Sequence, residues 1–236
     1  MIDLSVVIPV FNEEASLVEL HGRLATALRS IERPALRHET IFVDDGSTDR
    51  SREVVRELAV RDATVRLHAL LRNSGQTQAI LEGLERSAGA RVVTLDADLQ
   101  NPPEEIPRVY EALAAGHDLV LTRRRERNDP AVRRLASRVS NKLSSWIAGM
   151  PVSDHGCMLC GFSGDLVRRM CARPGRLAFI QALAVRYAKS PIEIDVDHAP
   201  RAHGKSRYSM LSLFELQLRA AISFRAARRG RSSDER

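Results

Sequence analysis

The sequence has few aromatic side chains, few cysteines and no long apolar segment. Aromatic residues make up 4% of its 236 residues, which disfavours a surface for single-stranded nucleic acid because such surfaces depend on aromatic stacking. Three cysteines are too few for a disulfide framework. No apolar run reaches the roughly 18 residues that span a bilayer, and no secretory signal precedes the first predicted strand. We therefore expect a soluble or peripheral protein of the cytoplasm.

Two phosphate-binding motifs are also missing. The first predicted strand is not followed by Gly-x-Gly-x-x-Gly, and the chain has no Walker loop, which disfavours dinucleotide binding and P-loop phosphoryl transfer. Cys157 and Cys160 form a CxxC, but the second ligand pair of a structural zinc site is absent. We interpret these cysteines as small buried side chains.

The composition indicates a globular domain with excess positive charge. Hydrophobic residues make up 44% of the chain, which is ordinary for one large domain. Its 36 Lys and Arg residues against 30 Asp and Glu residues give a formal net charge of +6. This charge favours an anionic partner: nucleic acid, a phosphate-bearing substrate or a membrane surface.

Apolar runs and amphipathic segments alternate along the chain. The β-branched run "LSVVIPV" (4–10) predicts a buried strand, and leucines at helical spacing predict a helix within 13–31. Further strands are predicted at 39–45, 65–71, 90–95 and 118–122, and further helices at 46–58, at 75–87 and after 102–103. Ser47 or Thr48 is the predicted N-cap of the second helix. The alternation predicts an α/β fold with a central, mostly parallel sheet and helices on both faces.

Polar residues follow the predicted strands, where open parallel sheets bind their ligands. The strand ends carry Pro9–Glu13, Asp44–Ser47, Arg72–Asn73, Asp96–Asp98 and Arg123–Arg124. Asp96 and Asp98 leave an extended chain on the same side, and their carboxylates would repel each other unless a cation lay between them. Mg²⁺ or Mn²⁺ prefers such oxygen ligands and commonly shares them with phosphates. The alternative is a pair of solvated loop aspartates, or an N-cap at Asp98.

Several motifs together resemble a known family. The segments "VVIPVFNEE", "FVDDGSTDRS", "LRNSGQTQAI", "TLDADLQNPPEEIP" and "DHGCML" resemble the successive motifs of inverting glycosyltransferase family 2, over about residues 2–210. The sequence is most similar to bacterial undecaprenyl-phosphate 4-deoxy-4-formamido-L-arabinose transferases and more distantly to dolichol-phosphate mannose synthases. The resemblance implies a GT-A fold, a UDP- or GDP-linked sugar donor, Mg²⁺ or Mn²⁺, and a polyprenyl-phosphate acceptor.

The resemblance also implies roles for individual residues. Those implied to bind the nucleotide sugar are Pro9, Phe11, Glu13, Gln76, Asp96 and Lys205, with Asp44 or Asp45 at the base or ribose; Asp98 and Gln100 are implied to hold the metal. Those implied to take part in catalysis, with Asp96 and Asp98, are Asp154, Arg124, Arg133 and Arg207. We single out Arg124 and Arg133 because guanidinium groups clamp phosphate oxygens, although the run at 123–127 could be a solvated basic face. Asp154 could instead cap a turn, and the segment at 201–209 could be an exposed basic linker.

Two features depart from the family pattern. Cys160 stands where the family usually has a basic residue, so a phosphate or acceptor contact could be lost there or supplied elsewhere. Relatives carry transmembrane helices after residue 210, whereas this sequence has an amphipathic stripe that could lie on an anionic bilayer, pack against a partner or cover the domain. We expect a GT-A domain at 1–208, a C-terminal amphipathic helix at 209–229 and a disordered tail at 230–236.

The leading hypothesis is an inverting glycosyltransferase that moves a sugar from a nucleotide to undecaprenyl phosphate, or a related polyprenyl phosphate, in cell-envelope or lipopolysaccharide glycan synthesis. We expect it to be peripheral to the inner face of the cell membrane, without a nucleic-acid partner, and leave open a homo-oligomer or a membrane-anchor partner. One alternative is a sugar nucleotidyltransferase, although "PVFNEE" lacks the glycine-rich loop expected of that class. The other is a non-catalytic module that binds membranes or nucleic acid through its arginines.

Overall fold

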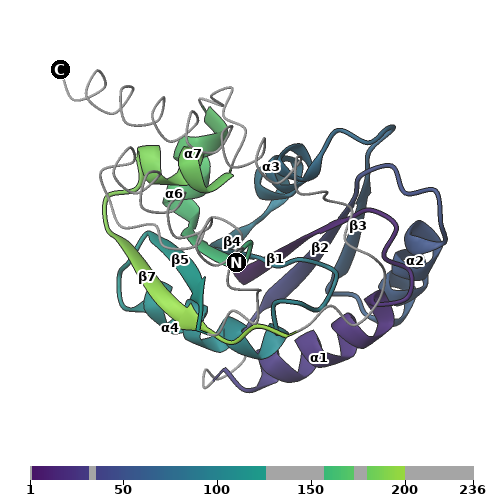
Figure 1. Ribbon diagram of the computed structural model, residues 1–236, viewed down its shortest axis with the longest axis horizontal. Coiled ribbons are helices and arrows are strands. Elements are labelled where there is room, and N and C mark those ends of the chain that lie inside the picture. Colours follow the sequence, from purple (N-terminus) through teal and green to yellow (C-terminus); the bar gives the residue numbers. More distant parts are fainter. Residues whose placement is uncertain (1, 32–35, 126–156, 173–179, 200–236) are drawn as a thin grey trace, which may run out of the picture.

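The computed structural model describes residues 2–31, 36–125, 157–172 and 180–199, which form a sheet flanked by helices (Figure 1). The strands are β1 (Ile2–Val10), β2 (His38–Asp44), β3 (Val65–Ala69), β4 (Gly89–Thr94), β5 (Leu119–Arg124), β6 (Cys160–Ser163) and β7 (Pro191–Val196). The helices are α1 (Leu17–Arg29), α2 (Ser51–Arg61), α3 (Gln76–Arg86), the short 3₁₀ helix η1 (Pro103–Glu105), α4 (Ile106–Ala114), α6 (Gly164–Ala172) and α7 (Ile180–Tyr187).

The sheet has the order β3-β2-β1-β4-β6-β5-β7. Its pairings are parallel except those of β6, which runs antiparallel to both β4 and β5. Parallel strands need crossover connections, and the amphipathic helices supply them. The predicted α/β fold with a mostly parallel sheet is therefore confirmed.

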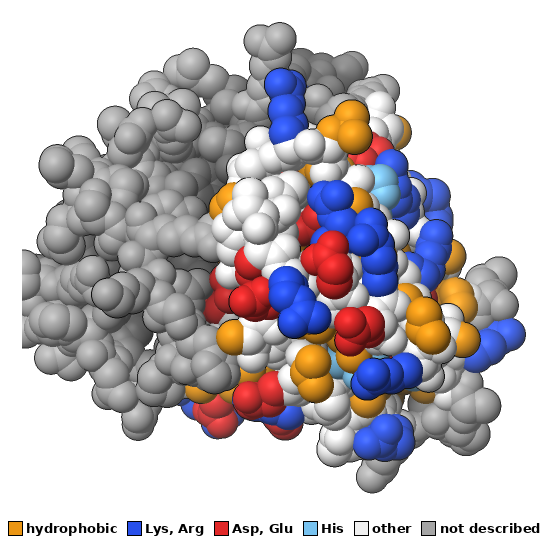
Figure 2. All heavy atoms as spheres, turned by 90° about the vertical axis from the view of Figure 1, so that its right-hand side faces the viewer, with side chains coloured by type: hydrophobic (Ala, Val, Ile, Leu, Met, Phe, Trp, Pro, Cys, Tyr) orange, Lys and Arg blue, Asp and Glu red, His pale blue; other side chains and the backbone are white. Residues whose placement is uncertain are grey.

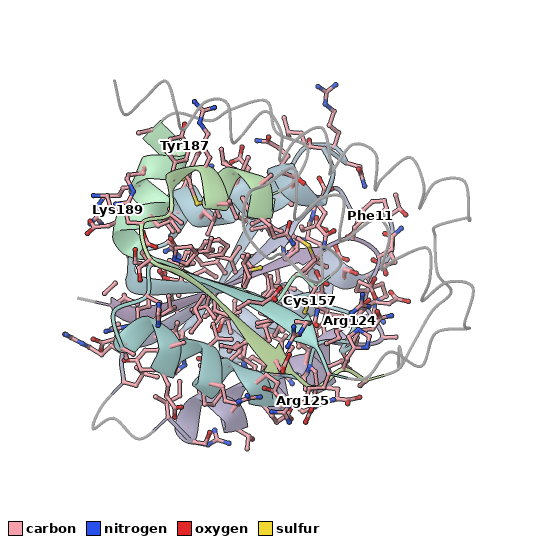
Figure 3. The ribbon with its side chains drawn as sticks, turned by 60° about the vertical axis from the view of Figure 1, so that its left-hand side comes forward. Phe11, Arg124, Arg125, Cys157, Tyr187 and Lys189 are labelled. Atoms are coloured by element: carbon pink, nitrogen blue, oxygen red, sulfur yellow. The ribbon has the colours of Figure 1, made fainter. Side chains whose placement is uncertain are left out.

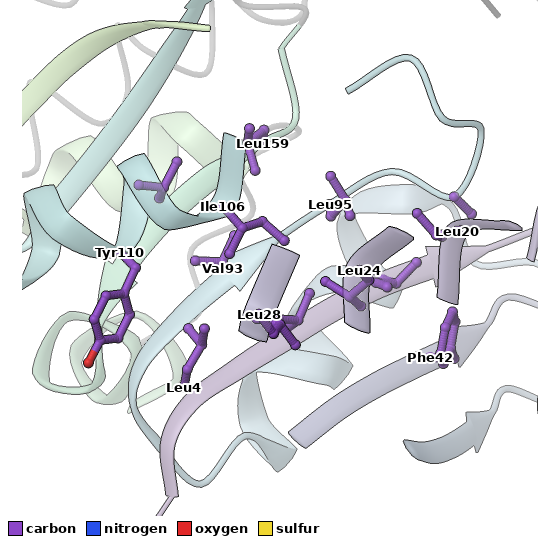
Figure 4. Close-up of a cluster of buried hydrophobic side chains, with 14 of the residues drawn as sticks. Leu4, Leu20, Leu24, Leu28, Phe42, Val93, Leu95, Ile106, Tyr110 and Leu159 are labelled. Atoms are coloured by element: carbon purple, nitrogen blue, oxygen red, sulfur yellow. The ribbon is translucent and has the colours of Figure 1, made fainter. Parts of the chain in front are cut away.

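Helices cover both faces of the sheet, as the alternation predicted (Figure 1). One hydrophobic core lies between the sheet and α1, α2 and α4, and Figure 4 shows Leu20, Leu24 and Leu28 of α1 in the same cluster as Leu4 and Val93. A second core lies between the opposite face and α3, α6 and α7. The central strands read as continuous apolar runs because they are buried on both sides.

The register brings the predicted site residues to one edge of the sheet. Strand β1 lies between β2 and β4, with Val10 beside Asp44 and Val7 beside Thr94. The ends of β2 and β4 therefore flank the end of β1. The segments that follow these two strands, at 45–47 and 95–98, lie on either side of the segment that follows β1.

The start of α2 differs from the prediction, whereas α1 lies within the predicted range of 13–31. Helix α1 begins at Leu17, and α2 begins at Ser51 with Arg50 at its N-cap, so neither Ser47 nor Thr48 caps it. The Ser47 hydroxyl instead accepts the backbone N–H of Asn12 at 3.0 Å, and the N–H of Thr48 donates to Asn12 Oδ1 at 2.8 Å. These groups pair across the sheet edge, which a local capping rule does not anticipate.

Within the described ranges, no helix combines the length and the apolar character needed to cross a membrane.

Candidate active site

The Asp96–Asp98 segment follows β4 as an alternation of buried and partly exposed side chains. Leu95, Ala97 and Leu99 are buried, whereas Asp96 and Asp98 are partly exposed. Leu99 adopts a left-handed backbone conformation with φ of 62°, which non-glycine residues rarely adopt, and its side chain is only 1% exposed. The strained turn is thus held by burial of Leu99, and it leaves the two carboxylates at the edge of the sheet.

Two amides hold the Asp96 carboxylate. Gln76 at the start of α3 donates from Nε2 to Asp96 Oδ1 at 2.7 Å, and Asn101 donates from Nδ2 to Oδ2 at 3.4 Å. Gln76 was predicted to contact the nucleotide sugar, and the structure places it on Asp96. Asn101 is 3% exposed and was not predicted. Only its place three residues beyond Asp98 could have drawn attention to it.

Behind Asn101 lies a buried hydrogen-bonded connection to strand β5. The Cys157 thiol is 3.3 Å from Asn101 Oδ1, and the Thr122 hydroxyl lies 2.9 Å from the Cys157 sulfur. Thr122 also donates to the Leu159 carbonyl at 2.6 Å. Cys157 is 2% exposed, so it is a buried side chain, as interpreted from the sequence. It links the Asp96 loop to β5.

Cys160 lies in β6 and is 0% exposed, within the core that also contains α3, α6 and α7. Burial, with smaller contributions from Cys157 and Asp96, raises the pKa of the Cys160 thiol well above its ordinary value. The thiol therefore stays neutral near pH 7. Position 160 therefore contributes to core packing in this chain, as the interpretation of Cys160 as a small buried side chain predicted.

Asp44 and Asp45 are both buried and both bound to protein groups. The Asp44 side chain is 0% exposed, and it accepts hydrogen bonds from Arg52 Nε at 2.7 Å and from the Ser47 N–H at 3.1 Å. Asp45 accepts the backbone N–H groups of Ser74 at 2.6 Å and Gly75 at 2.9 Å. Asp44 therefore fixes the loop that follows β2, and Asp45 fixes the loop that follows β3. Their contact with the base or ribose stays a prediction, and Arg52 was not predicted.

Pro9, Phe11 and Glu13 occupy the end of β1 and the loop after it. Pro9 and Phe11 are partly exposed, and Figure 3 shows Phe11 at the periphery of the molecule. The Glu13 N–H donates to the Ser51 hydroxyl at 2.8 Å, which ties this loop to the start of α2. The three residues therefore lie between the segments that follow β2 and β4, and their contact with a nucleotide stays a prediction.

The metal-binding residues predicted beside Asp96 lie on one short loop. Asp98 Oδ1 accepts the backbone N–H of Gln100 at 3.1 Å, and the Gln100 carbonyl accepts the N–H of Ala199 at 2.9 Å. The segment after β7 thus reaches the Asp98 loop, and the predicted late loop at 201–209 follows immediately in the sequence. Four predicted residues lie outside the described part of the chain: Arg133, Asp154, Lys205 and Arg207.

The arginines at the end of β5 divide between two sides. Arg123 pairs with Asp195 (Nε to Oδ1, 2.6 Å), and Arg125 pairs with Asp197 (NH1 to Oδ1, 3.4 Å), so both belong to surface ion pairs. The hydrogen bond from Arg123 holds the pKa of Asp195 below its ordinary value. Arg124 alternates with them along β5 and shares the strand face of Thr122, which contacts Cys157. Arg124 therefore lies on the face of β5 that Thr122, Cys157 and Asn101 connect to Asp96.

The donor set fits a hard divalent cation. Asp96, Asp98 and Gln100 offer carboxylate and amide oxygens on one loop, which suits Mg²⁺ or Mn²⁺ when phosphate and water complete the shell. Among the described residues, no cluster of three His, Cys, Asp or Glu side chains forms a complete cation cage.

The surface formed by α2 and β3 carries mixed charge. Figure 2 shows basic and acidic side chains interspersed there. Arg56 pairs with Glu53 at 3.4 Å, and Arg66 pairs with Glu39 at 2.7 Å. A continuous basic stripe, which nucleic-acid binding favours, is not found on this surface.

Comparison with known proteins identifies the family. The family model described as glycosyl transferase family 2 matches residues 5–171. The undecaprenyl-phosphate 4-deoxy-4-formamido-L-arabinose transferase of Pseudomonas paraeruginosa is 49% identical over 217 residues, covering 91% of this chain and 63% of that protein. The enzyme of that name from Edwardsiella ictaluri is 46% identical over 214 residues, covering 90% and 65%. This chain therefore spans a little under two thirds of the length of these relatives.

Solved structures share the fold at low sequence identity. Glucosyl-3-phosphoglycerate synthase from Mycobacterium tuberculosis, in complex with Mn²⁺, UDP-glucose and phosphoglyceric acid, superimposes with a TM-score of 0.67 at 19% identity, covering 95% of this chain and 79% of that one. Residues 1–349 of S. aureus TarS in complex with UDP-GlcNAc give a TM-score of 0.61 at 20% identity, covering 94% and 66%. Both support the GT-A fold. The extent of the family match and the identity to its named members show that this chain belongs to glycosyl transferase family 2.

Proposed function

We propose that this protein transfers a sugar from a UDP- or GDP-linked donor to a polyprenyl phosphate, with inversion at the sugar carbon. The observation that carries the proposal is the pair Asp96 and Asp98 at the carboxyl end of β4, with the Asp96 carboxylate oriented by Gln76 and Asn101. Sheets of this type bind ligands at that edge. The names of the relatives support undecaprenyl phosphate as the acceptor. We further propose the cytoplasmic face of the membrane as the place of reaction.

The donor would lie across the ends of β1, β2 and β4. Pro9, Phe11 and Glu13 would contact the nucleotide, and Asp45 would shape the pocket through its hold on the 74–75 backbone. Asp98 and Gln100 would bind the divalent cation, while Asp96 would face the sugar and diphosphate. A bound divalent ion stabilises the negative charge that develops on the departing diphosphate.

The acceptor side needs little proton transfer. A phosphate oxygen is already anionic at neutral pH, so the main task of the protein is to place it in line with the bond that breaks. Arg124, on the strand face of Thr122, would neutralise phosphate charge together with Arg133, Lys205 and Arg207. Asp154 would lie near the acceptor. The excess positive charge of the chain suits an anionic membrane surface.

Calorimetry with UDP and GDP, in Mn²⁺ and in chelator, tests the donor site. We expect one nucleotide to bind with micromolar affinity in Mn²⁺ and at least 10-fold more weakly in chelator. Asp98→Asn keeps the shape of the side chain and removes its charge, so it should abolish the benefit of the metal. Asp165→Asn is the matched control, because Asp165 is 73% exposed on α6 and pairs with Arg168.

Absence of nucleotide binding by the wild type in Mn²⁺ would remove the donor half of the proposal. A non-catalytic binding module on the same fold would then be the better account. Release of pyrophosphate from a nucleoside triphosphate would instead favour the nucleotidyltransferase alternative.

A further inference from the structure

Ser16 occupies the N-cap position of α1 but does not cap the helix. An N-cap serine normally accepts a backbone N–H from the first turn of its helix through its hydroxyl oxygen. The Ser16 side chain makes no such bond. Its hydroxyl lies 2.7 Å from the Ala97 carbonyl oxygen and 2.9 Å from the Glu13 carbonyl oxygen, and the residue is 1% exposed. The hydroxyl therefore serves a contact 81 residues away along the chain rather than its own helix.

The acceptor of this bond is the central residue of the Asp96–Asp98 segment. Ala97 is 4% exposed, so its carbonyl group is shielded from water and needs a protein donor. Strand β4 has already ended at that point, and the N–H of Leu95 makes a last bond to the Val7 carbonyl. The left-handed turn at Leu99 follows. Ser16 thus supplies a hydrogen bond to this segment after the strand ladder has stopped.

The second contact joins the same hydroxyl to the loop after β1. A hydroxyl has one proton, so Ser16 donates chiefly to the nearer carbonyl of Ala97 while the Glu13 carbonyl lies within reach. Its backbone N–H also donates to the Glu13 carbonyl at 3.0 Å. One residue therefore connects the loop that would contact the nucleotide with the loop that would hold the cation.

We infer that Ser16 is a positioning residue that fixes the Asp96–Asp98 turn in the geometry needed to bind the cation and the donor diphosphate. The inference rests on the proposed function and assigns Ser16 no contact with substrate. Because the hydroxyl acts through the Ala97 carbonyl, its removal should loosen the turn without altering a ligand. Metal affinity and local backbone protection should respond together.

Ser16→Ala and Ser16→Gly test the inference, with Ser5→Ala as the matched control. Ser5 is 0% exposed, and its hydroxyl donates to Glu39 at 2.7 Å and accepts the Gly89 N–H at 2.9 Å, at the opposite end of β1. Glycine is a good N-cap residue and alanine is a poor one. If Ser16 served mainly as a cap, Ser16→Gly would therefore behave like the wild type and Ser16→Ala would not.

Three measurements are made on each variant: calorimetric binding of Mn²⁺ with whichever of UDP and GDP the wild type binds, hydrogen exchange of the amides at 96–100, and the melting temperature. We expect both Ser16 variants to weaken Mn²⁺-dependent nucleotide binding about 10-fold and to exchange the 96–100 amides at least 10-fold faster, in line with the net worth of one buried hydrogen bond. Ser5→Ala should lower the melting temperature and leave both site measurements within 2-fold of the wild type.

The inference would be overturned if Ser16→Ala bound the nucleotide in Mn²⁺ and exchanged its 96–100 amides as the wild type does. It would also be overturned if Ser5→Ala weakened binding and accelerated exchange as much as Ser16→Ala. Recovery in Ser16→Gly alone would overturn it too, because capping would then be the role of Ser16. If the wild type binds neither nucleotide in Mn²⁺, the proposed function fails, while unchanged exchange at 96–100 in Ser16→Ala would separately refute the role of Ser16.

Discussion

Gly46 illustrates how a single residue without a side chain shapes the edge of the sheet. Its φ is 73°, and a Cβ atom added there would lie 2.7 Å from both the Arg72 carbonyl carbon and the Asn73 nitrogen. The neighbouring Asp45 holds the N–H groups of Ser74 and Gly75. Gly46 therefore allows the loop after β3 to lie against the loop after β2, at the place where the nucleotide pocket is proposed.

Gly46→Ala should destabilise the protein by about 2–4 kcal/mol, because a left-handed backbone and a steric overlap add together. Gly116→Ala is the control, since Gly116 has φ of 104° but no atom within 4 Å of an added Cβ. The free energy of unfolding of Gly116→Ala should fall by about 1–2 kcal/mol, from the backbone conformation alone. Urea denaturation measures both free energies of unfolding, and equal losses would show that the close approach of Gly46 to residues 72–73 contributes nothing.

At this same scale, motifs indicated candidate site residues more readily than they indicated the hydrogen-bond partners of those residues. Asp96, Asp98 and Gln76 were identified from motifs, and the structure brings Asp96 and Gln76 into contact. Asn101 and Ser16 were missed because their roles come from hydrogen bonds between segments distant in the sequence. Short polar side chains are common at loops and caps, so their presence alone predicts no such contact.

Among the secondary-structure elements, Glu39 connects three strands at the end of the sheet opposite the site. Its carboxylate accepts the Ser5 hydroxyl at 2.7 Å, the Ala88 N–H at 2.8 Å and Arg66 NH1 at 2.7 Å. Burial by itself would raise the pKa of Glu39, but these hydrogen bonds outweigh burial and lower the pKa below its ordinary value. The ionised carboxylate therefore stabilises the pairing of β1, β2 and β3.

A group whose pKa is lowered on folding contributes stability above its unfolded-state pKa, about 4.3 for Glu, and loses that contribution as pH falls through the folded-state value. Glu39→Gln should therefore cost about 1–3 kcal/mol near pH 7. The difference in the free energy of unfolding between wild type and variant should shrink below pH 4. Unfolding free energies measured in denaturant at pH 7, 5 and 3.5 give this difference directly. A difference that stays constant with pH would mean that the charge of Glu39 is irrelevant.

Hydrophobic spacing predicts where helices occur but not the residues at which they begin. Leucine spacing predicted a helix within 13–31, and α1 begins at Leu17, the first of these leucines. Helix α2, in contrast, begins later than its serine and threonine suggested, since Ser47 and Thr48 bond to Asn12. Helix boundaries depend on tertiary hydrogen bonds that hydrophobic spacing does not encode.

For the molecule as a whole, ligand binding should be visible as thermal stability. A ligand at 100 times its dissociation constant stabilises the folded state by about 2.7 kcal/mol, which corresponds to roughly 5–10 °C for a domain of this size. We expect UDP or GDP with Mn²⁺ to raise the melting temperature by this amount. The nucleotide in chelator, or Mn²⁺ without nucleotide, should raise it by less than about 2 °C. An equal rise in chelator would contradict a cation shared by Asp98 and the diphosphate.

Charge on the molecular scale separates the proposed function from its alternatives. The net charge of +6 by itself suits several anionic partners. The arginine run near residue 123 is partly neutralised, because Arg123 and Arg125 pair with Asp195 and Asp197. The positive charge at the end of β5 is therefore interrupted by these two ion pairs. The proposed local phosphate binding near Arg124 needs no continuous basic surface, whereas nucleic-acid binding favours one.

The sequence by itself determined the alternation of strands and helices, the two apolar faces of the sheet and the acidic strand ends, because hydrophobic spacing and motifs are local properties. Tertiary structure alone decided that β6 enters the sheet antiparallel between β4 and β5. It also decided that Asp44 and Asp45 are buried among loop contacts, and that Ser16 bonds to Ala97 instead of capping its helix. These features arise from contacts between segments far apart in the chain, and only the packed fold brings their partners within hydrogen-bonding distance.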